Sequence, residues 1–289
     1  MPHGQIKLII GMILFLSVTA HAEQTLLATK VGQPPVIDGK GGDPAWSQAT
    51  AITTHAHMAD IPVELQAVHD GKHLYMKARF PDPTENRVQK NLIWNKKSEL
   101  YLTGPKREDT FVIKWSMEEG KIDLSLTANA PYQADIWYWK AHRTDHAGRA
   151  DDKHQIYSTI PIKKSSQQVA KSGQVFHLAR RTDAGRSAYK KRIVIDFEGD
   201  EIDGLKLRTP EGSRADVAAK GEWEKGFWTV EFSRALDSRH ADDLAISKDK
   251  PVQFGISRYE IAGRKPDPDI EQPNYGSGEI GETLFLQLQ

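Results

Sequence analysis

Apolar and polar residues alternate along much of this chain, which is the pattern of β-strands with one buried face. In residues 74–80 the apolar positions fall on one side of an extended chain, while Lys77 and Arg79 fall on the other. The same alternation marks further strands at residues 111–117, 122–126, 193–197, 228–232, 252–256 and 284–288. Many short strands of this kind predict an all-β protein.

Turn residues separate the strands, and little of the chain has the period of a helix. Asp70-Gly71 is a strong turn signal. Residues 234–246 have room for one short helix. We therefore predict a β-sandwich of the immunoglobulin-like or jelly-roll type, with long loops at residues 163–191 and 262–278.

The first residues have the features of an export signal. Lys7 provides a positive start, residues 8–18 are apolar, and Ala20-His21-Ala22 matches the pattern that signal peptidase cleaves. The apolar run is shorter than the roughly 20 residues of a membrane-spanning helix. We expect residues 1–22 to be a signal peptide cleaved after Ala22, leaving a periplasmic domain at 23–289 with no integral membrane segment.

Charge and cysteine content exclude several classes of function. Lysine plus arginine number 39, as do aspartate plus glutamate, so no positive excess exists to drive nucleic-acid binding. The chain contains no cysteine, which excludes thiolate catalysis, iron–sulfur clusters and covalently attached c-type haem. Neither a Gly-x-Ser-x-Gly motif nor a phosphate-binding glycine loop is present, so we expect a protein without catalytic activity.

The most unusual segment is an aromatic block beside two cations. Trp137, Tyr138 and Trp139 are followed by Lys140 and Arg143. Such a block suits the wall of a flat ligand, with a cation available for its carboxylates. It also suits an ordinary strand with tryptophans in the core, and composition alone favours this second interpretation.

Histidines and aspartates gather just after the aromatic block. They are His142, Asp145, His146, Asp151, Asp152 and His154. Imidazole and carboxylate groups together bind zinc and similar divalent ions. His142 and His146 are four residues apart, and this spacing places two ligands on one face only in a helix. The sequence here is instead typical of a strand that continues into a loop. Solvated loop side chains are therefore the favoured interpretation.

Met117 follows the apolar positions of the 111–117 strand, so it is expected to point inward near the strand end. A methionine in that position usually fills space in a core. Its thioether is also a soft ligand for haem iron. The residues alone favour the packing role.

Several motifs, in order, resemble the ethylbenzene dehydrogenase-related haem-binding domain, which occurs in γ subunits of dimethylsulfoxide-reductase-type molybdenum enzymes and in related periplasmic cytochromes. The matching segments are residues 36–39, 43–46, 67–71, 79–84, 107–111, 135–143, 148–152 and 227–234. The Trp-Lys-Ala-His-Arg block is the most specific of them. The opening segment is shared with family 9 carbohydrate-binding modules.

The resemblance implies a b-type haem held without covalent bonds, with a methionine and a lysine as axial ligands. Met117 is the position that corresponds to the methionine. The lysine is expected near the end of the chain, where residues 272–278 contain none. Lys265, Tyr275, His69 and His73 are the remaining candidates for the second ligand, although a surface histidine beside the turn is the favoured interpretation for His69 and His73.

The resemblance implies that Trp137, Trp139, Lys140 and Arg143 line the cofactor. The expected function is electron transfer to or from a redox partner, such as a molybdenum enzyme or a membrane cytochrome. One alternative is a carbohydrate-binding sandwich with Trp137, Tyr138 and Trp139 on an exposed face. Another is a scaffold member of the family that binds no haem.

Overall fold

The structure, a computed structural model, describes residues 23–56, 61–259 and 282–289. The expected signal peptide at residues 1–22 lies outside the described residues, as do Lys265 and Tyr275. Among the residues that are described, no helix is long and apolar enough to cross a membrane.

One 13-stranded sheet makes up most of the molecule. Its strands follow the order β10 (Ser166–Val169), β11 (Val175–Thr182), β9 (Asp151–Ser158), β8 (Tyr132–Lys140), β7 (Thr110–Ser116), β17 (Val252–Tyr259), β18 (Leu284–Leu288), β1 (Gln24–Lys30), β3 (Ile61–His69), β4 (His73–Pro81), β16 (Phe227–Ala235) and β15 (Ala218–Glu224), and β2 (Ile52–Ala56) pairs with β3. Neighbours are antiparallel, except that β1 runs parallel to both β18 and β3. Short 3₁₀ turns lie at η1 (Trp46–Gln48), η2 (Asp145–Ala147) and η3 (Ser213–Ala215).

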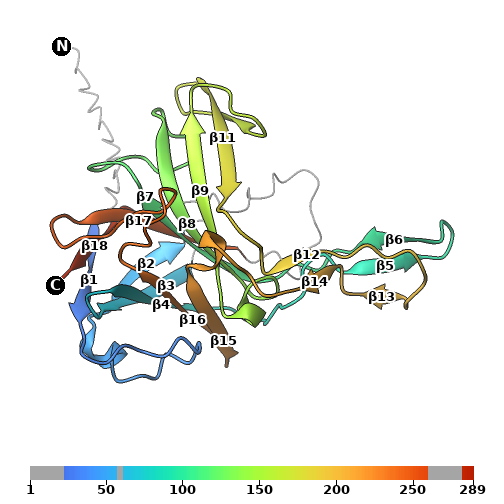
Figure 1. Ribbon diagram of the computed structural model, residues 1–289, viewed down its shortest axis with the longest axis horizontal. Coiled ribbons are helices and arrows are strands. Elements are labelled where there is room, and N and C mark those ends of the chain that lie inside the picture. Colours follow the sequence, from blue (N-terminus) through green and yellow to red (C-terminus); the bar gives the residue numbers. More distant parts are fainter. Residues whose placement is uncertain (1–22, 57–60, 260–281) are drawn as a thin grey trace, which may run out of the picture.

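The sheet folds over on itself and encloses the main core, so that β7 and β8 face β4 and β16 (Figure 1). Aromatic rings meet across the two layers. The Trp139 ring centre lies 4.9 Å from that of Trp228, and the Phe80 ring stacks on Phe111 at 5.2 Å. Alternation along each strand brings these side chains to the inner face. The predicted β-sandwich is therefore confirmed.

A second core covers the outer face of β7, β8, β9 and β11. The rings of Tyr157 and Phe176 stack at 4.5 Å, and the Tyr132 ring lies 5.1 Å from Tyr157. Residues 118–131 form a loop over this layer, and its Leu124 carbonyl accepts a 2.6 Å hydrogen bond from the buried Lys114 Nζ. Strands β7 and β8 are thus covered on both faces, which is why nearly every residue in them is buried, whichever face its side chain points to.

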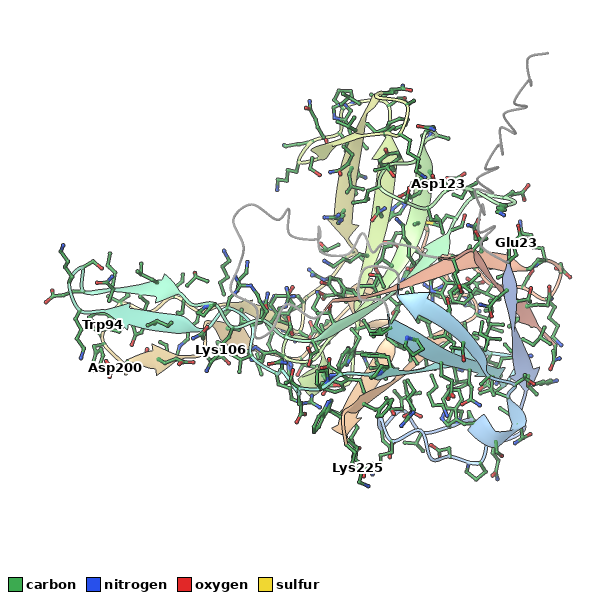
Figure 2. All side chains as sticks on the ribbon, turned by 180° about the vertical axis from the view of Figure 1, so that it is seen from behind. Glu23, Trp94, Lys106, Asp123, Asp200 and Lys225 are labelled. Atoms are coloured by element: carbon green, nitrogen blue, oxygen red, sulfur yellow. The ribbon has the colours of Figure 1, made fainter. Side chains whose placement is uncertain are left out.

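An arm extends away from the sandwich (Figures 1 and 2). It contains β5 (Leu92–Asn95), β6 (Leu100–Thr103) and β13 (Glu201–Ile202), and β12 (Tyr189–Lys191) pairs with β14 (Leu205–Leu207) near its base. Trp94 packs edge-on against Tyr101 and Phe197 within the arm.

Several local predictions are confirmed and others are wrong. The strands at 74–80, 228–232, 252–256 and 284–288 are present, and Gly71 occupies the β3–β4 turn at φ 89°. Residues 122–126 and 193–197 form no strand, residues 234–246 form no helix, and the expected loop at 163–191 contains β10, β11 and β12. Segment 122–126 fails to pair because its backbone bonds to side chains instead, such as that of Gln253.

Candidate functional site

The aromatic block lies inside the sandwich. Trp137 and Trp139 point into the main core and are 0 % exposed. The Trp139 Nε1 donates a 2.9 Å hydrogen bond to Asp145 Oδ1, which fixes its ring against Trp228. Tyr138 points to the opposite face of β8 and is buried in the second core. The expectation that these aromatic side chains lie on an exposed face, as in the carbohydrate-binding alternative, is therefore wrong, because packed layers cover both faces of β8.

Lys140 and Arg143 are each paired with a buried carboxylate. The Lys140 Nζ donates to Asp151 Oδ2, and the two side chains are 1 % and 3 % exposed. Burial lowers the pKa of Lys140 to about 8, although the Asp151 carboxylate opposes the shift. The Arg143 side chain donates to Glu108, whose carboxylate also accepts the Arg143 backbone N–H at 2.9 Å. Both cations thus neutralise carboxylates inside the fold.

The three histidines near these residues do not converge on one site. The His142 Nε2 lies 3.0 Å from Asp203 Oδ2, the His154 Nε2 lies 2.9 Å from Gln133 Oε1, and His146 is exposed. All three neighbouring aspartates are buried, namely Asp145, Asp151 and Asp152. The expectation of solvated loop carboxylates is therefore wrong, because these aspartates belong to strand β9 and to turn η2 beneath it.

Met117 lies just beyond β7 and lines a cavity of about 370 Å³. Its backbone N–H donates to the Gln133 carbonyl at 3.1 Å, so the chain is still held beside β8 as it leaves the strand. The cavity wall includes the apolar side chains of Leu244, Val252 and Phe285. Met117 is only half-buried, so the expectation that it fills the core is wrong. The inward face of β7 ends at Trp115.

Cations and acids form the rim of this cavity, which we call the Met117 cavity. Lys121, Lys250 and Glu119 line it, and the Lys250 Nζ lies 2.8 Å from Glu119 Oε1 at the surface. The volume falls within the range of about 300–1,000 Å³ that is usual for small-molecule sites. The cavity thus combines a thioether, an apolar wall and exposed lysines.

His69 is buried, and both of its ring nitrogens are engaged. The Nε2 lies 2.8 Å from the Gln289 carbonyl, and Nδ1 accepts the Gly71 N–H at 3.2 Å. Since the carbonyl can only accept, Nε2 carries the proton. A histidine bound in this way has no lone pair left for a metal, so His69 is excluded as an iron ligand in this conformation.

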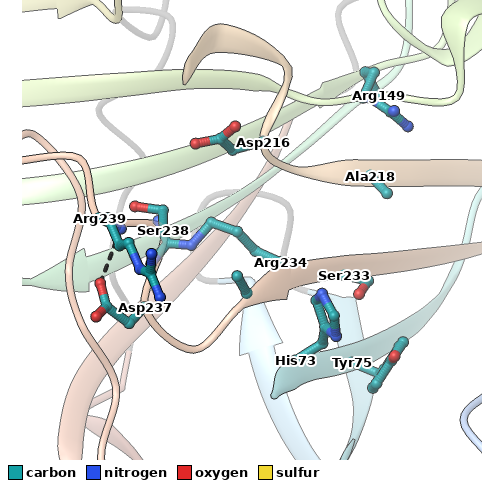
Figure 3. Close-up of a pocket in the computed structure, with 11 residues that line it drawn as sticks. His73, Tyr75, Arg149, Asp216, Ala218, Ser233, Arg234, Asp237, Ser238 and Arg239 are labelled. Carbon is teal, nitrogen blue, oxygen red and sulfur yellow. Dashed lines mark hydrogen bonds between the residues drawn. The ribbon is translucent and has the colours of Figure 1, made fainter. Parts of the chain in front are cut away.

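A second cavity, of about 590 Å³, opens beside β4 and β16 (Figure 3). His73 and Tyr75 line one side of it, and Arg149 and Asp216 lie opposite. The His73 Nδ1 is 3.4 Å from Asp70 Oδ2, which orients the imidazole ring. The lining is mostly polar and charged, so the cavity suits a hydrophilic ligand better than a porphyrin.

The sequence relationship is decided by one comparison. The family model described as ethylbenzene dehydrogenase matches residues 43–264, which is most of the chain. This protein belongs to the ethylbenzene dehydrogenase family. The resemblance inferred from the motifs is thereby confirmed. The matched region includes the aromatic block and Met117, strand β17 beside the Met117 cavity, and strands β4 and β16 beside the second cavity.

Comparisons with individual proteins are more distant. No curated protein matches this family member. A family 9 carbohydrate-binding module from Caldicellulosiruptor kristjanssonii, solved with glucose, is 13 % identical with a TM-score of 0.42, over 92 % of this chain and 96 % of that one. A Bacteroides uniformis structure described as carbohydrate-binding is 11 % identical with a TM-score of 0.43, over 92 % and 99 %. At this distance, neither structure bears on the ligand of this protein.

The residues beside the Met117 cavity fit the haem that the family resemblance implies. A half-buried thioether supplies the soft ligand, and Leu244, Val252 and Phe285 supply an apolar wall. Lys121 and Lys250 place cations at the rim, where each is paired at the surface with a carboxylate, Lys121 with Glu23 and Lys250 with Glu119. Trp137 and Trp139 do not line this cavity, and of the two further ligand candidates neither Lys265 nor Tyr275 lies within the described residues.

One group of polar residues was missed by sequence reasoning although the pattern contained a signal for it. Asp135 lies on the same face of β8 as Trp137, and Arg234 lies on the same face of β16 as Phe232. Both therefore point into the sandwich, and both are fully buried. A charge at an inward position of an alternating strand is the signal of a buried polar site.

Proposed function

We propose that this protein is a periplasmic electron-transfer protein that holds a b-type haem in the Met117 cavity. The observation that carries the proposal is the position of Met117, which lines a cavity with one apolar wall in a member of the ethylbenzene dehydrogenase family. A protein of this kind needs no acid, base or nucleophile. Its role is to set the ligands, the polarity and the accessibility of the iron.

Each part of the cavity has a task under this proposal. Met117 would hold the iron through its sulfur, and a thioether ligand favours the reduced state. Leu244, Val252 and Phe285 would exclude water, which also favours the less charged form. Lys121 and Lys250 would hold the propionates at the surface. When bound, the haem supplies a reversible one-electron change between ferric and ferrous iron.

The partner is then a redox protein that exchanges single electrons at this surface. A molybdenum enzyme or a membrane cytochrome is the kind of partner that the family relationship favours. Association as a subunit of a larger dehydrogenase and transient encounter are both compatible with electron transfer. The opening of the cavity between residues 118–121 and 247–251 is where such a partner would approach.

The test is an absorption spectrum of the exported protein from haem-replete cells, oxidised and then reduced with dithionite. We expect a Soret band and sharp reduced α and β bands. Met117→Leu keeps the apolar volume and removes the ligand, so it should change the reduced spectrum and lower the midpoint potential by on the order of 0.1 V. Met76→Leu is the matched control, since Met76 is a core methionine on β4.

Two results would contradict the proposal. A colourless protein that takes up no added hemin would favour a scaffold role instead. A haem protein whose spectrum is unchanged in Met117→Leu would place the haem elsewhere. His73→Ala and Tyr75→Phe then test the second cavity, where His73 and Tyr75 are side chains able to ligate iron.

A further inference from the structure

Three carboxylates meet inside one end of the sandwich. Asp135 comes from β8, Asp152 from the adjacent β9, and Asp243 from the loop that follows β16. One carboxylate oxygen of each lies within 4.8 Å of the others. Asp135 and Asp152 are both 0 % exposed, and Asp243 is buried. We call these three residues the aspartate cluster.

Among the residues that the structure describes, one cation, Arg234, faces the cluster, and its single charge does not balance the three carboxylates. The Arg234 Nη1 donates to Asp135 Oδ2 and lies 3.6 Å from Asp243 Oδ1, while Nη2 donates to the Leu244 carbonyl. Leu244 also donates its N–H to Asp135 Oδ2 at 3.0 Å. Three carboxylates against one guanidinium leave a buried charge of −2 if all are ionised.

Asp152 is the member without a partner. Among the described residues, neither of its oxygens has a hydrogen-bond donor or an ion-pair partner, while Asp135 Oδ1 and both oxygens of Asp243 also lack a donor although Arg234 lies beside them. Asp152 sits opposite Trp137 on the inward face of β9, so its carboxylate points to Asp135 and Asp243 rather than to water. A buried ionised carboxylate with no donor costs several kcal/mol, so the group must take up either a proton or a cation.

We propose that the aspartate cluster is a calcium site. All of its ligand atoms are carboxylate oxygens, which hard divalent cations prefer. Calcium binds its ligands at about 2.3–2.6 Å, so one ion can join oxygens up to about 5 Å apart, whereas magnesium at about 2.0–2.1 Å spans closer to 4 Å. Oxygens that lie within 4.8 Å of one another are within the reach of one calcium ion.

Without an ion, burial acts on the protonation of the cluster. Burial raises the pKa of Asp152 well above its ordinary value, and the charges of Asp135 and Asp243 raise it further. Nearby Asp183 is also buried, and burial raises its pKa to about 8, with the neighbouring acids adding to the shift. These directions describe the protein without the ion, in which a proton takes its place. A bound cation would reverse them.

The site would anchor a loop that borders both cavities. Asp243 belongs to the segment between β16 and β17, of which Leu244 and Ala245 line the Met117 cavity. Asp237 and Ser238 of the same segment line the second cavity (Figure 3). Calcium would therefore hold the wall of each cavity in place. This inference does not depend on haem binding, and it is tested without haem.

The experiment uses the exported full chain stripped with EGTA. Titration with CaCl₂, followed by calorimetry and thermal unfolding, should show one bound ion and a rise in melting temperature. Terbium is a luminescent substitute for calcium, and its emission on tryptophan excitation should appear and then fall as calcium displaces it. Trp137 lies beside the cluster, with its ring centre 5.0 Å from the Arg234 guanidinium.

Asp152→Asn is the decisive variant, because it keeps the shape and removes one ligand charge. We expect calcium affinity to fall by about tenfold or more, with a melting temperature in EGTA no lower than that of the wild type. Asp216→Asn is the matched control. Asp216 pairs with His240 in a neighbouring group that also includes Asp243, and it should leave the affinity unchanged.

Three outcomes would overturn the proposal. A wild type that binds neither calcium nor terbium would show that Asp152 is instead held neutral by a proton. Loss of binding in Asp216→Asn with binding retained in Asp152→Asn would move the ion to the neighbouring group. Tighter binding of magnesium or zinc than of calcium would refute the assignment of the ion. If Asp152→Asn does not fold, the wild-type titration still decides.

Discussion

The pair formed by Lys140 and Asp151 should stabilise the fold asymmetrically. The Lys140 Nζ donates to Asp151 Oδ2 beneath the rings of Tyr138 and Tyr189. Asp151 has further cations within reach, since the Arg214 Nη2 lies 3.8 Å from its Oδ1. Lys140 has Asp151 as its hydrogen-bonded carboxylate. Removing the acid should therefore cost more than removing the lysine.

The geometry sets the size of the effect. In Asp151→Asn, Lys140 must lose its proton or remain as an unpaired buried charge. Removing one partner of a buried ion pair costs about 3–5 kcal/mol, and we expect a loss in this range for Asp151→Asn. In Lys140→Met, Asp151 keeps Arg214, and the loss should be about 3 kcal/mol or less.

Urea unfolding of both single variants and of the double variant measures this difference. The double variant should be more stable than the sum of the single losses predicts, because neither charge is left alone. The cost of Asp151→Asn should shrink as pH rises from neutral to about 8 and stay level above it, because the wild-type Lys140, whose folded pKa is about 8, then loses its proton too. A loss below about 1 kcal/mol in Asp151→Asn, or a larger loss in Lys140→Met, would refute the reasoning.

Two further predictions concern packing and pH. A Cβ at Gly221 would lie 2.3 Å from the Trp139 ring, so Gly221→Ala should lower the unfolding free energy by about 1–3 kcal/mol, whereas Gly32→Ala, with open space around it, should be neutral in the same urea assay. Burial opposes ionisation of Asp70, but hydrogen bonds from the turn outweigh it and lower its pKa to about 2. The ionised Asp70 therefore adds to the free energy of unfolding above pH 4, and this contribution is lost as pH falls toward 2. Asp70→Asn should remove this part of the acid dependence, about 1 kcal/mol or less. Asp196→Asn, at an exposed position, is the control and should leave the acid dependence intact. An acid limb that is the same in Asp70→Asn and in the wild type would contradict that assignment.

Many residues that carry the family resemblance hold the fold together. The Glu231 carboxylate accepts the Trp46 Nε1–H at 2.7 Å and the Gly39 N–H at 2.7 Å, so it joins the opening segment to strand β16. Asp109 accepts from the Trp228 Nε1 at 3.1 Å. Glu231 and Asp109 are buried, and they accept hydrogen bonds from indole and backbone N–H groups that would otherwise have no partner. A match to the family motifs therefore reports the fold first, and the ligand only indirectly.

The sequence by itself determined the fold class and the strands β4, β7, β16, β17 and β18 of the sandwich. Alternation identifies a strand because side chains project to opposite faces every second residue, so Trp228, Val230 and Phe232 had to share one face. The Asp70-Gly71 turn followed from the same local rule, since a positive φ favours glycine. The prediction failed where alternation is not caused by pairing, as at Ile193 and Ile195, which are more than four-fifths exposed.

Only the tertiary structure decided which polar residues share a site. Periodicity assigns Asp135, Asp152 and Arg234 to inward faces, but it does not say which ends of which strands meet across the sandwich. Asp243 has no periodic signal, because it reaches the cluster from a loop. Likewise, the layer that covers β8 on its second face buried Tyr138 and Lys140, which an ordinary two-layer sandwich would leave at the surface. Distances between segments far apart in the chain are set by packing, and packing is not encoded in the pattern of any single strand.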